Sequence, residues 1–191
     1  MNTPPRHDDD HAVIIANTVD WLEKAVIGLN LCPFASPLLN ESNLRIAVCQ
    51  TSDAAHMRRA FLQELDLLQT STEQDIATTL LAFPHALQDF SDYLFLLDDV
   101  QELLLEAGLE GVVQLASFHP QYRFAGEAPD AASHYSNRAP YPLIHLLRED
   151  MVSRVLEDSA DPHQIPNRNI ERLDTIGAEE LERRWREIFS R

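Results

Sequence analysis

The chain has 191 residues, of which 45% are hydrophobic and 24% are charged, and its formal net charge at pH 7 is -16. This length suits one domain with a sizeable core, and this composition is typical of a soluble globular protein. The acidic balance, without a basic stripe that alternates with aromatics, excludes nucleic acid as an expected partner. Because no apolar run reaches the roughly 18 to 20 residues of a membrane span, we expect a cytoplasmic protein without a membrane partner.

The first ten residues, MNTPPRHDDD, have neither the basic nor the apolar region of a signal peptide. We expect a flexible tail over residues 1–10 and a single α/β domain over residues 11–191. Apolar residues recur at every third or fourth position from Ala12 to Leu29, which predicts an amphipathic helix. The segment LCPFASP, which contains two prolines, ends that helix.

Three short apolar segments follow, and helical patterns separate them. The predicted strands are LRIAVC (44–49), ATTLLAF (77–83) and VVQLASF (112–118). One predicted helix follows the first strand, with Ser52 or Asp53 as its N-cap. A second helix is predicted over 89–107, and Gly108 ends it. Connections of about two dozen residues that contain a helix are typical between parallel strands. We therefore predict a small, mostly parallel three-stranded sheet, β-α-β-α-β, covered by helices.

The C-terminal third combines a long loop with further helix. Residues 119–141 show no periodicity and several aromatics, which indicates an ordered loop of functional interest. Pro142 fits the first turn of a helix that would run to about Glu157, and a last helix is expected from about Ala178 to Phe189. The complete prediction is an α/β fold with an N-terminal helix and two C-terminal helices.

The loop and the helix expected after it differ from the rest of the chain in charge. Residues 119–148 contain three arginines, three histidines and only two acidic residues, within a chain of 31 acidic and 15 basic residues. Such a local reversal of charge favours a site for a small anion. The alternative is that the arginines only anchor the loop through its carbonyl groups.

Four residues of this region are candidates for substrate binding. On a helical wheel Arg148 falls inside the apolar arc, so its guanidinium needs carboxylate, carbonyl or ligand partners, and the structural alternative to a ligand is a buried ion pair. Asn137 and Arg138 directly precede the predicted helix, whose N-terminal amides favour negative charge. Tyr141 lies four residues before His145 and would share its face.

Three residues are candidates for catalysis. His119 follows a predicted strand, at the edge where open α/β sheets bind ligands. His145 is either a proton carrier or a core histidine. Cys32 becomes a nucleophile if Pro33 opens a helical turn and Cys32 caps it, and otherwise it is an inert apolar residue. Cys32 and Cys49 are expected to be reduced thiols.

Metal and nucleotide chemistry have weaker support. Cys32, His119, His134 and His145 offer ligands suitable for zinc, but their spacing matches no compact metal motif, and we predict no metal site. The sequence has no phosphate-binding glycine motif, no GxSxG and no HExxH. It identifies no cofactor and predicts no oligomeric state.

Long segments of the chain resemble a known family. They are GLNLCPFA (28–35), SFHPQYRFAG (117–126), SNRAPYPLIHLLRE (136–149) and IPNRNIERL (165–173). In these segments and their spacing the chain resembles a bacterial family catalogued as domain of unknown function 1415. The resemblance implies a single family domain and assigns no activity, cofactor or catalytic residue.

These observations lead to one functional hypothesis and one alternative. The hypothesis is an enzyme that acts on a small anionic metabolite by acyl or phosphoryl transfer or hydrolysis, at a site of cysteine, histidine and arginine. The alternative is a module without catalysis that binds a small anion or a partner protein through the same loop.

Overall fold

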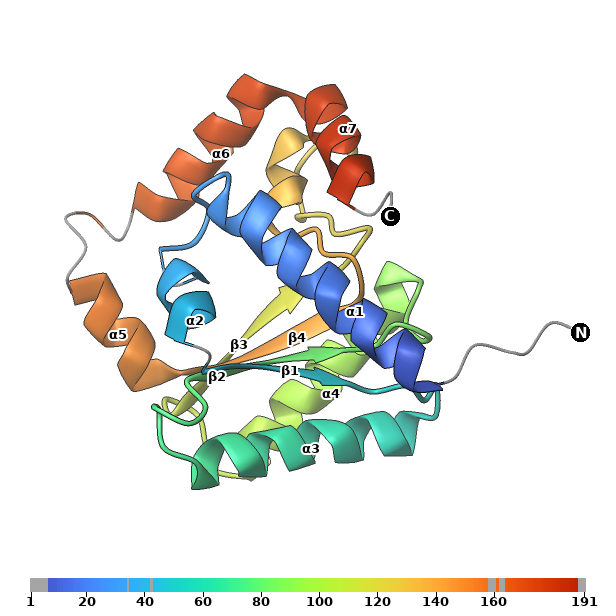
Figure 1. Cartoon of the computed structure of the whole chain (residues 1–191), viewed down its shortest axis with the longest axis vertical. Coiled ribbons are helices and arrows are strands. Elements are labelled where there is room, and N and C mark those ends of the chain that lie inside the picture. Colours follow the sequence, from blue (N-terminus) through green and yellow to red (C-terminus); the bar gives the residue numbers. More distant parts are fainter. Residues whose placement is uncertain (1–6, 34, 42, 158–160, 162–163, 189–191) are drawn as a thin grey trace, which may run out of the picture.

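A computed structural model describes residues 7–33, 35–41, 43–157, 161 and 164–188 (Figure 1). In chain order its elements are α1 (His7–Trp21), the π-helix η1 (Leu22–Ile27), α2 (Ala35–Glu41), β1 (Leu44–Val48), α3 (Ala54–Thr70), β2 (Thr78–Ala82), α4 (Phe90–Glu106), β3 (Val113–Phe118), the 3-10 helix η2 (Ala132–Ser136), β4 (Leu143–Arg148), α5 (Glu149–Glu157), α6 (Ile165–Ile176) and α7 (Ala178–Ile188).

The strands form one mixed sheet in the order β1-β2-β4-β3. β1 and β2 are parallel, and β4 lies between β2 and β3 and is antiparallel to both. The α/β class is therefore confirmed, whereas the prediction of a three-stranded, mostly parallel sheet is wrong. The three predicted strands do run in one direction, so their carboxyl ends share one edge of the sheet.

The missing strand is β4, which the sequence analysis assigned to the first half of a helix from Pro142 to Glu157. LIHLLR pairs with a strand on each side and is apolar on both faces, as a central strand requires. In a run this short, helical and strand periodicities fit equally well. The helix begins only at Glu149, as α5.

Helices cover both faces of the sheet. The α3 face, defined here as the face that bears Ile144, Leu146 and Arg148 of β4, packs against α3 and α4. The α1 face, which bears Leu143 and His145, packs against α1, η1 and α2 (Figure 1).

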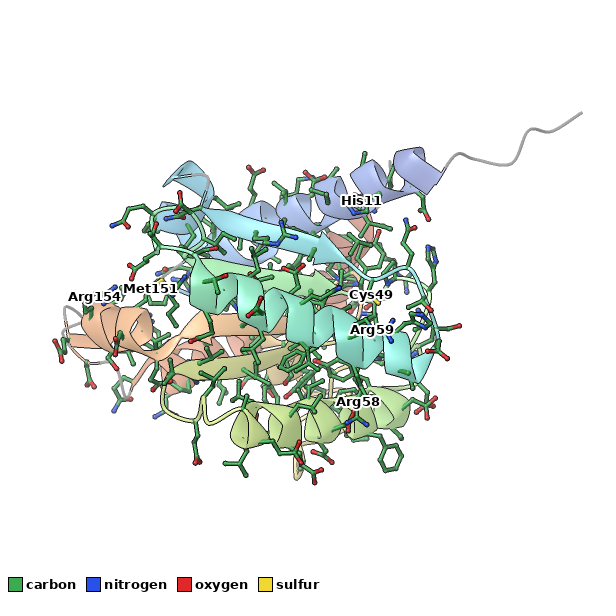
Figure 2. All side chains as sticks on the ribbon, turned by 90° about the horizontal axis from the view of Figure 1, so that it is seen from below. His11, Cys49, Arg58, Arg59, Met151 and Arg154 are labelled. Carbon is green, nitrogen blue, oxygen red and sulfur yellow. The ribbon has the colours of Figure 1, made fainter. Side chains whose placement is uncertain are left out.

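Figure 2, which views the molecule from below, shows α3 and α4 side by side in front of the sheet. In the same view Cys49 marks one end of the sheet, and Met151 and Arg154 of α5 lie at the opposite end. The α3 face is therefore covered along its length by two long helices.

Local signals at the helix ends were read correctly in two places. Asp53 caps α3, because its Oδ1 accepts a hydrogen bond of 2.9 Å from the backbone N–H of His56. Gly108, with a φ of +70°, follows the end of α4. α6 was not predicted, although Pro166 in its first turn and Gly177 after its last residue are ordinary helix boundary signals.

At the N-terminus, α1 begins at His7, so residues 7–10 of the expected tail are helical. The remaining residues of that expected tail, 1–6, lie outside the described part of the chain. Among the helices of the described ranges, none is both long enough and apolar enough to span a bilayer.

Candidate functional site

A cavity of about 680 Å³ lies on the α1 face of the sheet. This volume is in the range of pockets that hold a small organic molecule. Alternate residues of the antiparallel strands form its floor, since Ala116 of β3 and His145 of β4 are paired directly in the register. The floor residues are Leu44, Leu80, Gln114, Ala116, His145 and Leu147.

The walls come from segments that are distant in sequence. Trp21, Leu22 and Val26 line the cavity from the end of α1 and from η1, and the first residues of α6 line it from another side. Loop residues between β3 and β4 complete the wall. A π-helix is rare and occurs often at functional sites, and here η1 supplies two apolar side chains to the cavity.

Two polar atoms of the wall have no hydrogen-bond partner among the described residues. They are Ser133 Oγ, on a residue that is only 6% exposed, and Asn169 Oδ1. The amide of Asn169 is oriented by its Nδ2, which donates to the Leu31 carbonyl over 2.7 Å. Both atoms are buried within the wall and have no surface open to the cavity, so they are unpaired atoms of the packing behind the lining.

The charge of the cavity differs from what the sequence analysis expected. Among its described lining residues, Glu127 is the one with a formal charge, and none is lysine or arginine. Apolar side chains form most of the remaining lining. The cavity is therefore suited to a mainly apolar molecule.

His145 is the only histidine among the described residues that line this cavity. Its Nε2 lies 2.7 Å from Thr78 Oγ1, and the Thr78 hydroxyl donates to the Leu146 carbonyl over 2.6 Å. Burial disfavours the imidazolium and lowers the pKa of His145 to about 4, so the ring is neutral at pH 7.

The structure does not bring all the predicted site residues together. Cys32, Asn137 and His145 line the cavity, whereas the other four do not. Asn137 has structural contacts as well, because its Nδ2 donates to the Ser117 carbonyl over 3.0 Å and its Oδ1 accepts from Ser136 Oγ over 2.8 Å. It therefore holds the loop against β3 at the edge of the cavity.

His119 is fully buried and both of its ring nitrogens are used. Its Nε2 lies 2.9 Å from the Leu87 carbonyl, and its Nδ1 accepts from the backbone N–H of Gln121 over 3.0 Å. Burial lowers the pKa of His119. His134 makes the same pair of backbone contacts, to the Ala128 carbonyl and the Phe124 N–H. Both histidines thus tie loop segments together through backbone groups.

Arg148 lies on the α3 face, on the other side of the sheet from His145. Its guanidinium donates to the carbonyls of Leu68, Ser71 and Ile76 at distances between 2.6 and 3.2 Å. These carbonyls belong to the end of α3 and the segment that follows it. Of the partners that the sequence analysis considered, the structure thus shows backbone carbonyls, and neither a ligand nor a buried carboxylate. Arg148 contacts them from strand β4 and not from the predicted helix.

Arg138 and Tyr141 also contact other parts of the protein. The Arg138 guanidinium carbon lies 4.3 Å from the centre of the Tyr135 ring, in a cation–π contact, and its Nε has no hydrogen-bond partner among the described residues. The Tyr141 hydroxyl accepts from Asn17 Nδ2 over 2.9 Å and so joins the loop to α1.

Cys32 does not have the N-cap position that the nucleophile hypothesis required. α2 begins at Ala35, after residue 34, which lies outside the described residues. The partly buried side chain of Cys32 lines the cavity. Cys49 is buried, and burial raises the pKa of its thiol. Neither cysteine forms a disulfide.

Metal ligands do not gather in the described parts of the chain, where no group of three histidine, cysteine or acidic side chains is placed to hold an ion. Sequence reasoning missed three residues of the site: Thr78, Ser133 and Asn169. Thr78 and Asn169 lie in a predicted strand and in a family segment, but no motif distinguishes them. Their role depends on contacts between distant segments.

Comparison with known proteins gives a family and nothing more specific. The family model described as protein of unknown function (DUF1415) matches residues 13–183. No curated protein and no solved structure matches the chain.

Proposed function

The chain belongs to the family described as protein of unknown function (DUF1415), and we propose that it binds a neutral, mainly apolar small molecule in the cavity on the α1 face. The observation that supports this function best is a cavity of about 680 Å³ whose lining is mostly apolar, with no lysine or arginine among its described residues. A bound molecule would bury its apolar surface against this lining.

Energetics support the proposal. A ligand that moves apolar surface from water onto the apolar lining gains roughly 25 cal/mol for each Å² that is buried.

A neutral ligand replaces the small anion that the sequence analysis expected. An anion in this cavity would meet the Glu127 carboxylate and a neutral His145, with no lysine or arginine among the described lining residues. Moving an anion from water into such a site without a cationic partner is unfavourable.

A fluorescent probe tests this proposal directly. N-phenyl-1-naphthylamine is neutral, mainly apolar and brighter in an apolar site, and 8-anilino-1-naphthalenesulfonate has the same rings with an added sulfonate. We expect the neutral probe to bind and to receive excitation energy from Trp21, a cavity residue. Ala116→Leu, which fills the floor, should weaken this binding by about tenfold. Val112→Leu, at an exposed position outside the cavity lining, is the control.

Two results would contradict the proposed function. One is the absence of binding of the neutral probe. The other is equal binding in Ala116→Leu and in the unchanged protein, since this would place the probe elsewhere on the molecule.

A second candidate function is acyl transfer or hydrolysis, and its support is that Cys32 and His145 line the same cavity. The thiol would attack an ester carbonyl to give a thioester, the alcohol would leave with the thiol proton, and water would then release the acid. The low pKa of His145 makes it a weak base for the thiol, so binding without turnover is our first choice.

The assay for the second candidate is hydrolysis of 4-nitrophenyl decanoate. If this function is correct, Cys32→Ser should lose hydrolysis and keep binding of the neutral probe. Equal hydrolysis by the unchanged protein and Cys32→Ser would exclude Cys32 as the nucleophile.

A further inference from the structure

We infer that the polar group of the ligand is a hydrogen-bond donor and that Nδ1 of His145 accepts its hydrogen bond. The class of ligand is then an alcohol, phenol or amide with a large apolar body. This inference rests on the proposed function. It also depends on which ring nitrogen of His145 carries the hydrogen.

The Thr78 hydroxyl determines which nitrogen of His145 carries the hydrogen. Its single hydrogen is committed to the Leu146 carbonyl, 2.6 Å away, because a carbonyl can only accept. The contact of 2.7 Å between Thr78 Oγ1 and His145 Nε2 must therefore be donated by the ring. Nε2 carries the hydrogen of the neutral imidazole.

Nδ1 is consequently left with a lone pair. A neutral imidazole has one N–H, so when Nε2 donates, Nδ1 can only accept. In the described part of the chain Nδ1 makes no hydrogen bond. Although Nδ1 has no partner, it is not one of the fully buried unpaired atoms of the described chain, so it has accessible surface. Because His145 lines the cavity, the lone pair of Nδ1 is open to that space.

The charged group of the lining has the same preference, because the Glu127 carboxylate accepts hydrogen bonds. Gln114, in the floor, has both a donor and an acceptor. A ligand that brings an O–H or N–H therefore has acceptors at His145 and at Glu127.

Two isomeric competitors test this preference. Decan-1-ol and methyl nonyl ether have the same formula and similar apolar bodies, but only the alcohol has an O–H. Each is used to displace N-phenyl-1-naphthylamine from the full-length protein. We expect the alcohol to compete about tenfold more strongly than the ether. Equal competition by the two isomers would overturn the inference while leaving the proposed function in place.

Two substitutions separate the nitrogens of His145. In His145→Gln the amide nitrogen can take the place of Nε2 and still donate to Thr78, but the Nδ1 acceptor is gone. In His145→Asn the amide oxygen lies near the position of Nδ1, so an acceptor is kept. We expect the preference for the alcohol to disappear in His145→Gln and to persist in His145→Asn. The opposite order would contradict the inference.

The proton can also be observed without any ligand. Long-range proton–nitrogen spectra of the unchanged protein distinguish a protonated ring nitrogen from an unprotonated one. We expect the His145 hydrogen on Nε2, and a hydrogen on Nδ1 would overturn the inference. Failure of the neutral probe to bind at all would instead overturn the proposed function together with the ligand class drawn from it.

Discussion

The two faces of the sheet are built in different ways. On the α3 face, residues of the strands pack with α3 and α4 in a continuous core, which includes Phe61, Tyr93 and Leu146 at 0% exposure. On the α1 face, the floor of β3 and β4 is separated from η1 and α6 by a cavity of about 680 Å³. Dense packing on one face therefore coexists with a wide space on the other.

The two faces also use their polar groups differently. On the α3 face, the Tyr93 hydroxyl donates to the Leu143 carbonyl and accepts from the Phe118 N–H, and Arg148 binds three carbonyls. On the α1 face, Nδ1 of His145 makes no hydrogen bond in the described chain, and His145 lines the cavity. Strand β4 thus stabilises the fold with Arg148 and leaves His145, three residues earlier, open to a ligand.

The largest effect is expected on the α3 face, from Arg148→Met. The change leaves the carbonyls of Leu68, Ser71 and Ile76 without their shared donor, and we expect a loss of about 3 kcal/mol or more in the free energy of unfolding. Urea denaturation measures this loss. The control Arg154→Met removes an exposed ion pair with Glu73 and should leave the free energy of unfolding close to that of the unchanged protein.

The same variant can contradict the comparison of the two faces. Binding of the neutral probe should be unchanged in folded Arg148→Met, because Arg148 does not line the cavity. A protein of full stability that has lost binding would restore Arg148 as a ligand contact.

The second largest effect is expected on the pH dependence of stability, through His145 on the α1 face. The folded protein holds the pKa of His145 at about 4, below the value of roughly 6.5 in an unfolded chain. Between these values the unfolded state binds a proton that the folded state does not, so stability is complete above about pH 6.5 and decreases as the pH falls toward 4. We expect this histidine to account for about 2 kcal/mol of that decrease.

Urea denaturation across this pH range, compared between the unchanged protein and His145→Gln, isolates the contribution of His145. His119 also has a lowered pKa, but it is present in both proteins and cancels in the difference. Stability curves with the same slope in the two proteins would show that the α1 face does not disfavour charge at His145.

Features that depend on residues close together in the chain were predicted correctly from the sequence, and features that depend on contacts between distant segments were not. The helix–strand alternation, a cap at Ser52 or Asp53 and the end of α4 at Gly108 depend on neighbours in sequence, and they are confirmed, with Asp53 as the capping residue. Strand β4 was missed because LIHLLR satisfies both periodicities and only its pairing with β2 and β3 decides between them. That error also produced the helical wheel on which the role of Arg148 was based.

The candidate site was predicted in part. Cys32, Asn137 and His145 were selected from residue type and position, and they line one cavity. His119 and Arg148 were selected for their chemistry, but a buried histidine or arginine can also bind backbone carbonyls, and the sequence does not show which carbonyls come near. Ser133 and Asn169 had no local signal, because their unpaired atoms result from the packing of distant segments.

A matched pair of alanines compares the packing of the two faces. Ala47 of β1 belongs to the core of the α3 face, and Ala116 of β3 belongs to the cavity floor. We expect Ala47→Leu to cost about 1 to 3 kcal/mol in urea denaturation because it overpacks a filled core. Ala116→Leu should change stability by less than about 0.5 kcal/mol, or increase it, because the cavity accepts the added carbons. Equal destabilisation by the two changes would mean that the α1 face is as tightly packed as the α3 face.

The smallest effect is expected from Arg138→Met, which tests the remaining candidate for anion binding. The change removes the cation–π contact with Tyr135, and the apolar methionine side chain can still cover that ring, so we expect a loss of about 0.5 to 1 kcal/mol in thermal or urea denaturation. Binding of the neutral probe should stay within twofold of the unchanged protein, since Arg138 is outside the cavity lining. Binding of the sulfonate probe that is present in the unchanged protein and lost in Arg138→Met would identify a separate anion site at this arginine, and the α1 face would then have two kinds of ligand contact instead of one.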